Sequence, residues 1–170
     1  MPGAGKEEFV KVARDVGFDF VRMGDVVRDE GRKRGIDESN IGSFAHTERQ
    51  VHGMDVWARR TVPYVKEGML IDGCRGLSEI KVFQREIGEG VRTIAVHTSP
   101  GERFRRLVER GRADAPEDWD EFLERDNREL GWGLGKVIST ADIMIVNEGD
   151  LREFREKVRS LLERLRRDEI

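Results

Sequence analysis

Short apolar segments alternate with longer amphipathic segments along most of the chain. The segments with strand character cover residues 18–23, 69–73, 91–99 and 141–149, and each is followed by residues with helical spacing. Such alternation predicts parallel strands joined by helices that cover both faces of a sheet. We therefore expect an α/β protein with four visible strands, and the length of 170 residues is typical of a single domain.

The spacing of apolar residues, with capping and breaking residues, places the helices between these strands. The segments expected to be helical are 5–16, 25–35, 54–63, 78–88, 100–112, 116–130 and 150–168. Gly17 is expected to end the first helix, Ser78 to cap the fourth and Pro100 to start the fifth. Residues 36–53 are polar, and we expect them to be irregular.

The composition argues against several classes of protein. Charged residues make up 38% of the chain, but 31 basic residues are balanced by 34 acidic ones, so no nucleic-acid partner or anionic membrane surface is expected. The single cysteine, Cys74, excludes a disulfide framework, and the three histidines match no metal-ligand spacing. No apolar run approaches the roughly 18 residues of a membrane span, so we expect a cytoplasmic protein and leave its oligomeric state open.

The sequence GAGK at residues 3–6 is typical of part of a phosphate-binding loop. Gly3 and Gly5 carry no side chains, so backbone N–H groups can approach an anion, and the following helix directs its positive end to the same place. Lys6 adds a full positive charge. The complete pattern is Gly-x-x-x-x-Gly-Lys-Ser/Thr, and here Glu7 takes the place of the hydroxyl residue. For this motif alone, a glycine-rich helix start without a ligand remains the alternative.

Two Asp–Arg pairs follow two different strands. Asp25 and Arg28 come after the first visible strand, and Asp72 and Arg75 close the second. Open parallel sheets bind ligands at the carboxyl ends of their strands, whereas a lone surface ion pair is common and weak. Together with Lys6, the two pairs favour a phosphate-handling site.

Arginines are concentrated after the third strand. They are Arg103, Arg105, Arg106, Arg110, Arg112, Arg125 and Arg128. Guanidinium groups suit a transferring phosphoryl group, whose charge is spread over several oxygens. Ion pairing with neighbouring carboxylates is the alternative, and Arg103 and Arg105 are expected to face solvent. Asn147, after the last strand, is the polar residue expected beside an adenine ring.

The order of these motifs resembles that of an archaeal family of P-loop proteins, which is similar in turn to adenylate kinases and dephospho-coenzyme A kinases. The motifs are PGAGK (2–6), MGDVVR (23–28), IDGCR (71–75), RLVERGRADAP (106–116), ERDNRELGWGLG (124–135) and ADIMIVNEG (141–149). The resemblance covers nearly the whole chain. It implies a three-layer fold like that of nucleoside-monophosphate kinases, with a five-stranded parallel sheet in the order 2-3-1-4-5.

The resemblance also implies which residues bind the donor nucleotide and its metal ion. The donor-binding residues would be Gly3, Ala4, Gly5, Lys6, Glu7, Glu8 and Asn147, with ATP or GTP as the nucleotide. Asp72 would help to hold Mg²⁺, and Glu7 is the second candidate ligand because it occupies the hydroxyl position.

On the acceptor side, Arg28 and Arg75 resemble the arginines that bind the acceptor phosphate in adenylate kinases. Residues 36–66 would form an acceptor-binding helical insertion, and residues 110–118 would form a short lid, within one domain spanning residues 1–170. The arginines at the two ends of this lid would be Arg106 and Arg110 on one side and Arg112 and Arg125 on the other.

Two features depart from the family pattern. Glu7 replaces a hydroxyl; a carboxylate can bind Mg²⁺, but it repels phosphate when no metal is present. The sheet order places the first strand at the centre, and no strand precedes the loop in this sequence. We therefore expect that strand to be missing and Met1 to be an internal methionine. The 170-residue form would then be poorly stable, with an open slot between residues 69–73 and 91–97.

The leading interpretation is a nucleotide-kinase-like phosphotransferase that moves the γ-phosphoryl group of ATP or GTP to a small phosphorylated nucleotide or coenzyme acceptor. A phosphate acceptor needs no general base, whereas Asp25 would be the base for a hydroxyl acceptor. The alternative is a nucleotide-binding switch or assembly factor with slow hydrolysis and no small-molecule acceptor. Glu7 and the short lid favour that alternative.

Overall fold

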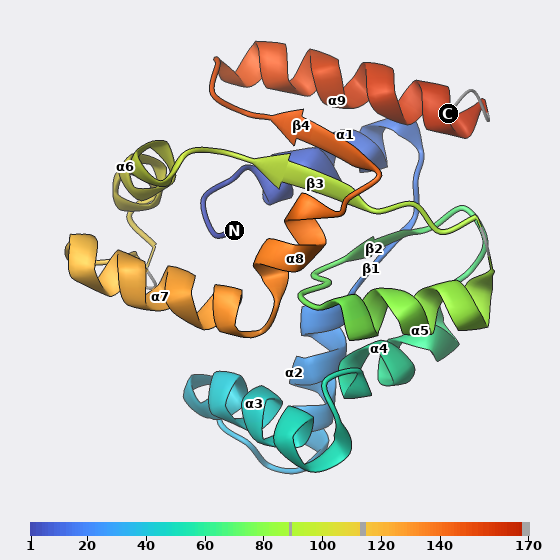
Figure 1. Ribbon diagram of the computed structural model, residues 1–170, viewed down its shortest axis with the longest axis vertical. Helices are drawn as coiled ribbons and strands as arrows, with labels where there is room; N and C mark the ends of the chain where they lie inside the picture. The colour runs from blue at the N-terminus through green and yellow to red at the C-terminus, as the bar shows by residue number, and fades with distance from the viewer. Residues whose placement is uncertain (89, 113–114, 168–170) are drawn as a thin grey trace. The chain divides into compact units, whose positions relative to one another are not determined.

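The computed structural model describes residues 1–88, 90–112 and 115–167 (Figure 1). The chain divides into two compact units. Unit 1 combines residues 1–17 with residues 92–170, and unit 2 consists of residues 18–91. Each unit contains one pair of parallel strands with helices packed around it, so the chain is an α/β protein.

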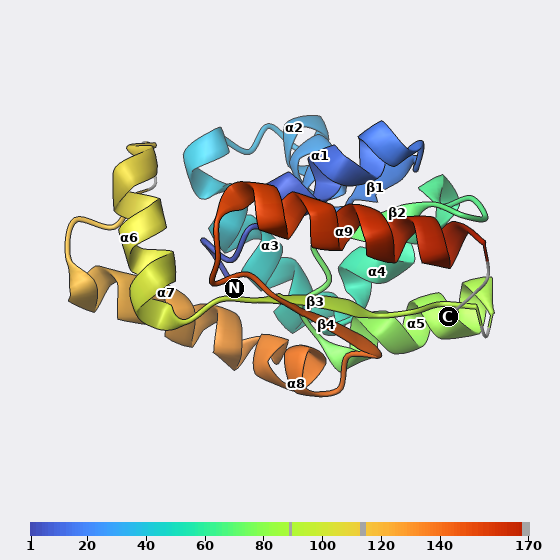
Figure 2. The same cartoon turned by 90° about the horizontal axis from the view of Figure 1, so that it is seen from above.

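Unit 1 is built on the parallel strands β3 (Ile94–His97) and β4 (Ile143–Val146), which pair from Ile94 with Ile143 to His97 with Val146. Its helices are α1 (Lys6–Val16), α6 (Pro100–Arg110), α7 (Trp119–Gly131), α8 (Leu134–Ser139) and α9 (Leu151–Arg166). Helices α1 and α9 lie side by side, as both views show (Figures 1 and 2). They carry buried side chains at helical spacing, namely Phe9, Val10, Val12 and Ala13 on α1 and Phe154, Val158 and Leu162 on α9.

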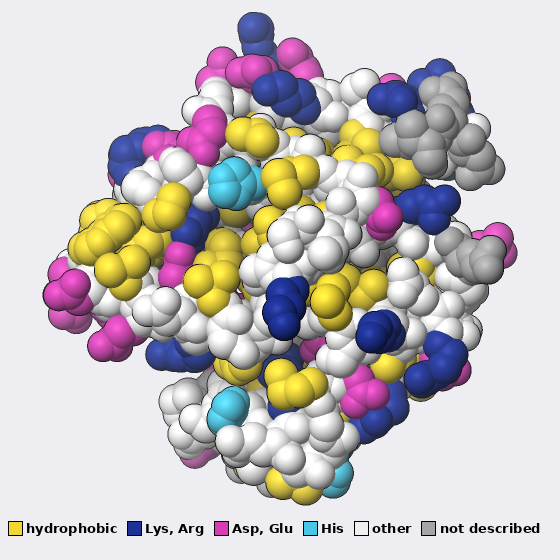
Figure 3. All heavy atoms as spheres, in the orientation of Figure 1, with side chains coloured by type: hydrophobic (Ala, Val, Ile, Leu, Met, Phe, Trp, Pro, Cys, Tyr) yellow, Lys and Arg dark blue, Asp and Glu magenta, His cyan; other side chains and the backbone are white. Residues whose placement is uncertain are grey.

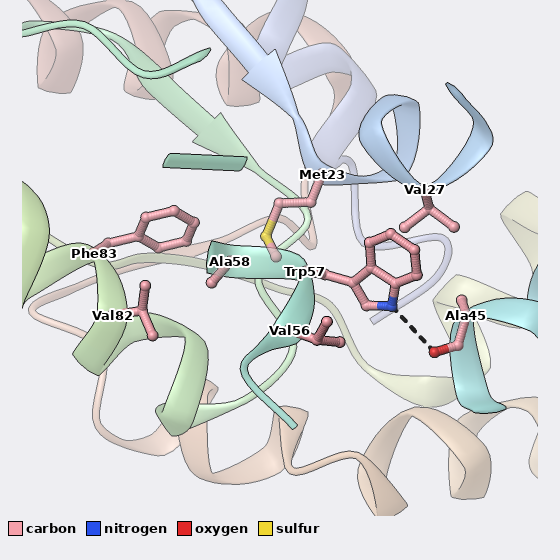
Figure 4. Close-up of a cluster of buried hydrophobic side chains, with 8 residues drawn as sticks. All are labelled: Met23, Val27, Ala45, Val56, Trp57, Ala58, Val82 and Phe83. Carbon is pink, nitrogen blue, oxygen red and sulfur yellow. Dashed lines mark hydrogen bonds between the residues drawn. The ribbon is translucent and has the colours of Figure 1, made fainter. Parts of the chain in front are cut away.

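Unit 2 contains the parallel strands β1 (Phe20–Arg22) and β2 (Leu70–Asp72), in a register that sets Arg22 opposite Asp72. Its helices are α2 (Met23–Lys33), η1 (Glu38–Asn40), α3 (Ile41–His52), α4 (Val56–Thr61), η2 (Val62–Tyr64) and α5 (Leu77–Ile87). An apolar cluster around Trp57 joins α2, α3, α4 and α5, and the Trp57 indole donates a hydrogen bond to the Ala45 carbonyl oxygen at 3.1 Å (Figure 4).

All four expected strands are present, and most of the expected helices are found within a few residues of their predicted bounds. Gly17 ends α1 at a φ of 93°, and Pro100 is the first residue of α6, as predicted. Ser78 is not the cap of α5, which begins at Leu77. Instead, the Glu79 carboxylate accepts hydrogen bonds from the N–H groups that precede the helix.

Two α-helices were not predicted, and part of the apolar face of α7 is exposed. Residues 41–52 form α3 although they were expected to be irregular, and residues 134–139 form the short helix α8. On α7, only Phe122 of the apolar residues on one side is fully buried, while Trp119 and Leu123 remain about two-fifths exposed, at 41% and 38%. Apolar side chains are visible over α6 and α7 in Figure 3. No described helix is long and apolar enough to cross a membrane.

Candidate functional site

The glycine-rich loop leads into α1 with a backbone that only glycine adopts easily. Gly3 has a φ of 80° and Gly5 a φ of 105°, both in the left-handed region. The surroundings are also close-packed. A Cβ atom on Gly3 would lie 2.8 Å from the Arg103 carbonyl oxygen, and one on Gly5 would lie 2.3 Å from the Asn147 side-chain nitrogen. Conformation and space therefore both require glycine at these two positions.

Buried polar side chains from the ends of β3 and β4 hold the loop between the two glycines. The Ala4 carbonyl oxygen accepts a hydrogen bond from the Asn147 amide at 2.9 Å, and the Thr98 hydroxyl lies 3.1 Å from the same oxygen. Thr98 is also 3.0 Å from the Asn147 carbonyl oxygen. Asn147 was expected beside an adenine ring; in the structure its side-chain N–H group contacts the loop backbone. Thr98 was missed because the strand expected at 91–99 included it, whereas β3 ends at His97.

Three charged residues begin α1. The Lys6 ammonium lies 3.7 Å from the Glu7 carboxylate, and both side chains are partly exposed, at 53% and 41%. Glu8 instead binds Lys11 at 2.5 Å and Arg155 of α9 at 2.7 Å. The hydrogen bond from Lys11 is the main cause that lowers the pKa of the Glu8 carboxyl, although its partial burial acts in the opposite direction. Lys6 and Glu7 therefore lie partly exposed beside the loop, and Glu8 is paired with Lys11 and Arg155.

Arg103 is buried, and the prediction that it faces solvent is wrong. Its side chain is only 3% exposed, and its guanidinium binds Asp126 of α7 through both nitrogens, at 2.8 Å and 2.5 Å. It also donates to the Thr98 carbonyl at 3.1 Å and to the Pro2 carbonyl at 3.3 Å. Arg105, by contrast, is more than half exposed, as predicted, and pairs with Glu102 and Glu109 on its own helix.

The arginines expected near a lid occupy both sides of the connection between α6 and α7. Arg106 is half-buried and donates to Glu102 at 2.7 Å, while Arg110 is the last residue of α6 and is exposed. Arg112 is exposed, and Arg125 is half-buried on α7. Within the predicted lid at 110–118, residues 113 and 114 lie outside the described residues.

In unit 2, the first Asp–Arg pair lies in the first two turns of α2. Arg28 donates a hydrogen bond to Asp25 three residues before it, and both side chains are more than a third exposed. The pair is therefore in contact with solvent, where such an interaction contributes little to stability. Arg28 can exchange this contact for a contact with a ligand at small cost.

The second pair is placed by the end of β2. Asp72 is almost fully buried, and its carboxylate lies 3.4 Å from the Nε atom of Arg22, its partner in the strand register. Arg75 follows in the turn to α5, where its backbone N–H donates to the Glu79 carboxylate at 2.6 Å. Glu79 also lies 3.4 Å from the buried guanidinium of Arg49 on α3. Neither Arg22, Arg49 nor Glu79 was singled out from the sequence.

Cys74 lies in the same turn of unit 2. Its thiol contacts the Gly76 carbonyl oxygen at 3.8 Å. Burial is the main cause that raises the pKa of the Cys74 thiol far above its usual range, and the neighbouring Glu79 charge acts in the same direction. The raised pKa favours the protonated thiol at neutral pH.

The two candidate metal ligands belong to different units. Glu7 belongs to unit 1 and Asp72 to unit 2. Among residues 1–88, 90–112 and 115–167, no group of three or more His, Cys, Asp or Glu side chains is arranged to hold a metal ion. Carboxylate oxygens are nevertheless ligands of the kind that Mg²⁺ prefers, and a nucleotide supplies further oxygens.

Comparison with known proteins agrees with the geometry of the loop. A family model described as an AAA domain matches residues 1–122. A UPF0200 protein of Thermoplasma volcanium is 44% identical over 166 residues, which cover 95% of this chain and 92% of the relative. UPF0200 proteins of Hyperthermus butylicus and Methanopyrus kandleri are 44% and 48% identical, cover 97% and 95% of this chain, and are themselves covered to 91% and 85%. The chain therefore belongs to the archaeal UPF0200 family and contains a kinase-like P-loop domain of the nucleotide-binding type.

Proposed function

We propose that the protein is a phosphotransferase that moves the γ-phosphoryl group of ATP or GTP to a small phosphorylated nucleotide or coenzyme. The observation that carries the proposal is the loop at residues 2–6. Its two glycines have left-handed backbones, its central carbonyl is held by Thr98 and Asn147, and Lys6 begins the helix that follows. This arrangement suits the phosphates of a nucleotide, because backbone N–H groups, a helix N-terminus and a cation all lie at one place.

The strand pairing supports the kinase-like topology within which we place this loop. In the sheet order 2-3-1-4-5, we assign β1, β2, β3 and β4 to strands 2, 3, 4 and 5. The pairs β1–β2 and β3–β4 are both parallel, and under this assignment they match the pairs 2-3 and 4-5. In that order, the carboxyl ends of all strands meet at one edge, where a donor and an acceptor bind. We propose this order for the protein.

For the acceptor, we propose that Arg28 and Arg75 bind its phosphate and that the helical segment at residues 36–66 recognises the rest of it. The partly exposed Arg28 can contact an anion, and the backbone of Arg75 is held by Glu79. Charge-assisted hydrogen bonds of this kind are shorter and stronger than neutral ones. Asp25 acts as the general base only if the acceptor reacts through a hydroxyl group.

Charge on the transferring group requires cations as well as a closed site. We propose that Arg106, Arg110, Arg112 and Arg125 provide this stabilisation from both sides of a lid at residues 110–118. Glu7 and Asp72 would hold Mg²⁺, which neutralises charge on the donor phosphates when bound. Asn147 contributes to nucleotide binding through the loop, since its amide donates to Ala4.

A second function is favoured by one specific residue. Glu7 lies 3.7 Å from Lys6 and places a negative charge beside the ammonium that would meet the donor phosphates. A site of this kind could bind nucleotide without fast transfer, as a switch or assembly factor with slow hydrolysis.

The two functions are distinguished by following the labelled γ-phosphate of ATP and of GTP in the presence of Mg²⁺. The purified protein is mixed with a panel of nucleoside monophosphates and dephospho-coenzyme A. Transfer of label to one acceptor, lost in Lys6→Ala, supports the phosphotransferase. Release of inorganic phosphate alone, at a rate that no acceptor changes, supports the switch. Absence of nucleotide binding would contradict both functions.

A further inference from the structure

One buried guanidinium connects three segments of unit 1. Arg103 lies on the first turn of α6 and is 3% exposed, which is rare for an arginine that is not a ligand or part of a network. Its nitrogens contact Asp126, the Thr98 carbonyl and the Pro2 carbonyl. The plane of the guanidinium also lies over the Phe122 ring, with 4.9 Å between the Cζ atom and the ring centroid.

One of these contacts reaches the phosphate-binding loop directly, and a second reaches it through Thr98. The Pro2 carbonyl belongs to the loop itself. The Thr98 carbonyl belongs to the residue whose hydroxyl lies beside the Ala4 carbonyl. The backbone of Arg103 also packs against Gly3, where a Cβ atom would lie 2.8 Å from its carbonyl oxygen. Arg103 therefore contacts the loop through its backbone and through its side chain.

The third contact fixes α7. Both oxygens of Asp126 bind the guanidinium, and this two-point geometry restricts rotation of the helix about its own axis more than a single bond would. Arg125, which we place among the charge-stabilising residues, is the adjacent residue on α7. Any rotation that moved Asp126 away from Arg103 would also displace Arg125.

We propose that Arg103 is a positioning residue: it holds the phosphate-binding loop in its binding conformation, and its pair with Asp126 ties that conformation to the placement of α7. The role rests on the proposed function, because it concerns the same phosphate site. It differs from a merely structural role, since the loop geometry depends on the two carbonyl contacts, whereas the packing of α6 against α7 depends on the charge pair.

The test compares Arg103→Lys with the double variant Arg103→Lys/Asp126→Glu. A lysine keeps the positive charge but lacks the planar guanidinium that binds two carboxylate oxygens at once. Glutamate is longer than aspartate, so it can restore contact with the shorter lysine side chain. Amide hydrogen exchange at residues 3–6 is measured in the ligand-free protein, together with the melting temperature. Calorimetry gives the affinities for Mg²⁺–ATP and Mg²⁺–tripolyphosphate. Arg105→Lys, an exposed arginine on the same helix, is the matched control.

We expect Arg103→Lys to speed amide hydrogen exchange at residues 3–6 about tenfold or more. It should lower the affinities for Mg²⁺–ATP and Mg²⁺–tripolyphosphate by the same factor, because only the phosphate site is disturbed. The double variant should recover melting temperature but not loop protection, and Arg105→Lys should change neither. Loop protection equal to that of the unaltered protein, or protection that returns together with the melting temperature, would overturn the proposal. If Arg103→Lys does not fold, Asp126→Glu takes its place.

Failure of the positioning role and failure of the proposed function give different results. If the unaltered protein binds neither ligand, the proposed function fails, and exchange at residues 3–6 still decides whether Arg103 holds the loop. If the ligands bind and Lys6→Ala abolishes binding while Arg103→Lys does not weaken it, the function stands and the positioning role fails.

Discussion

Each unit has a buried arginine–carboxylate pair that contacts a candidate loop, but the two pairs contact their loops in opposite ways. In unit 1, the arginine faces the loop, and Arg103 donates to backbone carbonyls. In unit 2, the carboxylate faces the loop, and Glu79 accepts from the N–H groups of Arg75 and Gly76. The backbone supplies hydrogen-bond acceptors in unit 1 and donors in unit 2. The charge nearest the backbone is therefore positive in unit 1 and negative in unit 2.

The two pairs also differ in geometry. Arg103 and Asp126 form two short bonds, whereas Arg49 and Glu79 approach at a single distance of 3.4 Å. A weak pair that is this deeply buried adds little net attraction, but loss of one partner leaves the other charge in an apolar environment. We therefore expect Glu79 to stabilise the loop of unit 2 through the backbone N–H groups that it binds, more than through attraction to Arg49.

The largest expected effect follows from Glu79→Ala. This change removes the carboxylate that lies beside the buried Arg49 guanidinium and accepts from two backbone N–H groups. The free energy of unfolding should fall by about 3–5 kcal/mol, measured by urea denaturation. Glu86→Ala, in the same helix but exposed and paired with its neighbour Arg85, should change it by less than about 0.5 kcal/mol. Equal effects would show that the unit 2 pair does not support its loop.

The next effect separates the ligands of the two loops. Arg75→Ala should raise the KM of the acceptor identified in the labelling panel far more than that of the donor. The loss corresponds to about 1.5–3 kcal/mol for one charge-assisted hydrogen bond, or roughly 10–100-fold. Arg28→Ala should behave in the same way. Steady-state kinetics with each substrate varied in turn provide the measurement, and an equal rise in both KM values would refute the division into donor and acceptor sides.

Lys6→Ala is the corresponding change in unit 1. Nucleoside triphosphate affinity should fall more than about tenfold, or about 1.4 kcal/mol, because the loop loses its cation. The fold should be retained, since the Lys6 side chain is more than half exposed. Calorimetry compares this variant with Lys11→Ala, an exposed lysine of the same helix that pairs with Glu8. Unchanged affinity would remove the phosphate-binding assignment from the loop.

Glu7→Thr should have a smaller and opposite effect. A hydroxyl binds Mg²⁺ without adding negative charge beside the phosphates, so we expect turnover equal to or higher than that of the unaltered protein, with a steeper dependence on Mg²⁺ concentration. Initial rates over a range of Mg²⁺ concentrations measure both quantities. Complete loss of activity would show instead that the Glu7 carboxylate is a required ligand.

The smallest effect concerns an exposed pair on α6. Hydrogen bonds from Arg105, and then from Arg106, hold the pKa of the Glu102 carboxyl at about 2, below its usual 4.5. Because this pKa is depressed in the folded protein, its contribution to stability is present above pH 4.5 and is lost as the pH falls toward 2. Glu102→Gln should therefore flatten this part of the stability–pH curve and leave it unchanged near neutrality, as thermal melts across the pH range would show.

Local patterns carried most of the fold and part of the site. The strands and amphipathic helices have regular apolar spacing, and the two loop glycines belong to the GAGK motif, which is recognisable in the sequence. Helix α3 escaped prediction because its buried residues include Glu48 and Arg49, so its buried face does not read as apolar. Helix α8 has only six residues and offers too few positions for a period.

The role of Arg103 could not be predicted, because its burial depends on Asp126, which is 23 residues away, and on the loop, about 100 residues away. In sequence it looks like the neighbouring Arg105. The sheet order, the acceptor-binding insertion and the lid concern how larger parts of the chain are arranged, and they stay predictions.

The raised pKa of Cys74 makes its thiol a natural reporter on the turn after β2. Thiol reagents react with the thiolate, and the raised pKa disfavours that form of the partly buried Cys74, so this one cysteine should be labelled slowly. The labelling rate should therefore respond to any change that exposes the segment carrying Asp72 and Arg75, without any introduced probe. An acceptor that orders this segment should lower the labelling rate of Cys74, and a donor nucleotide that does not contact it should leave that rate unchanged.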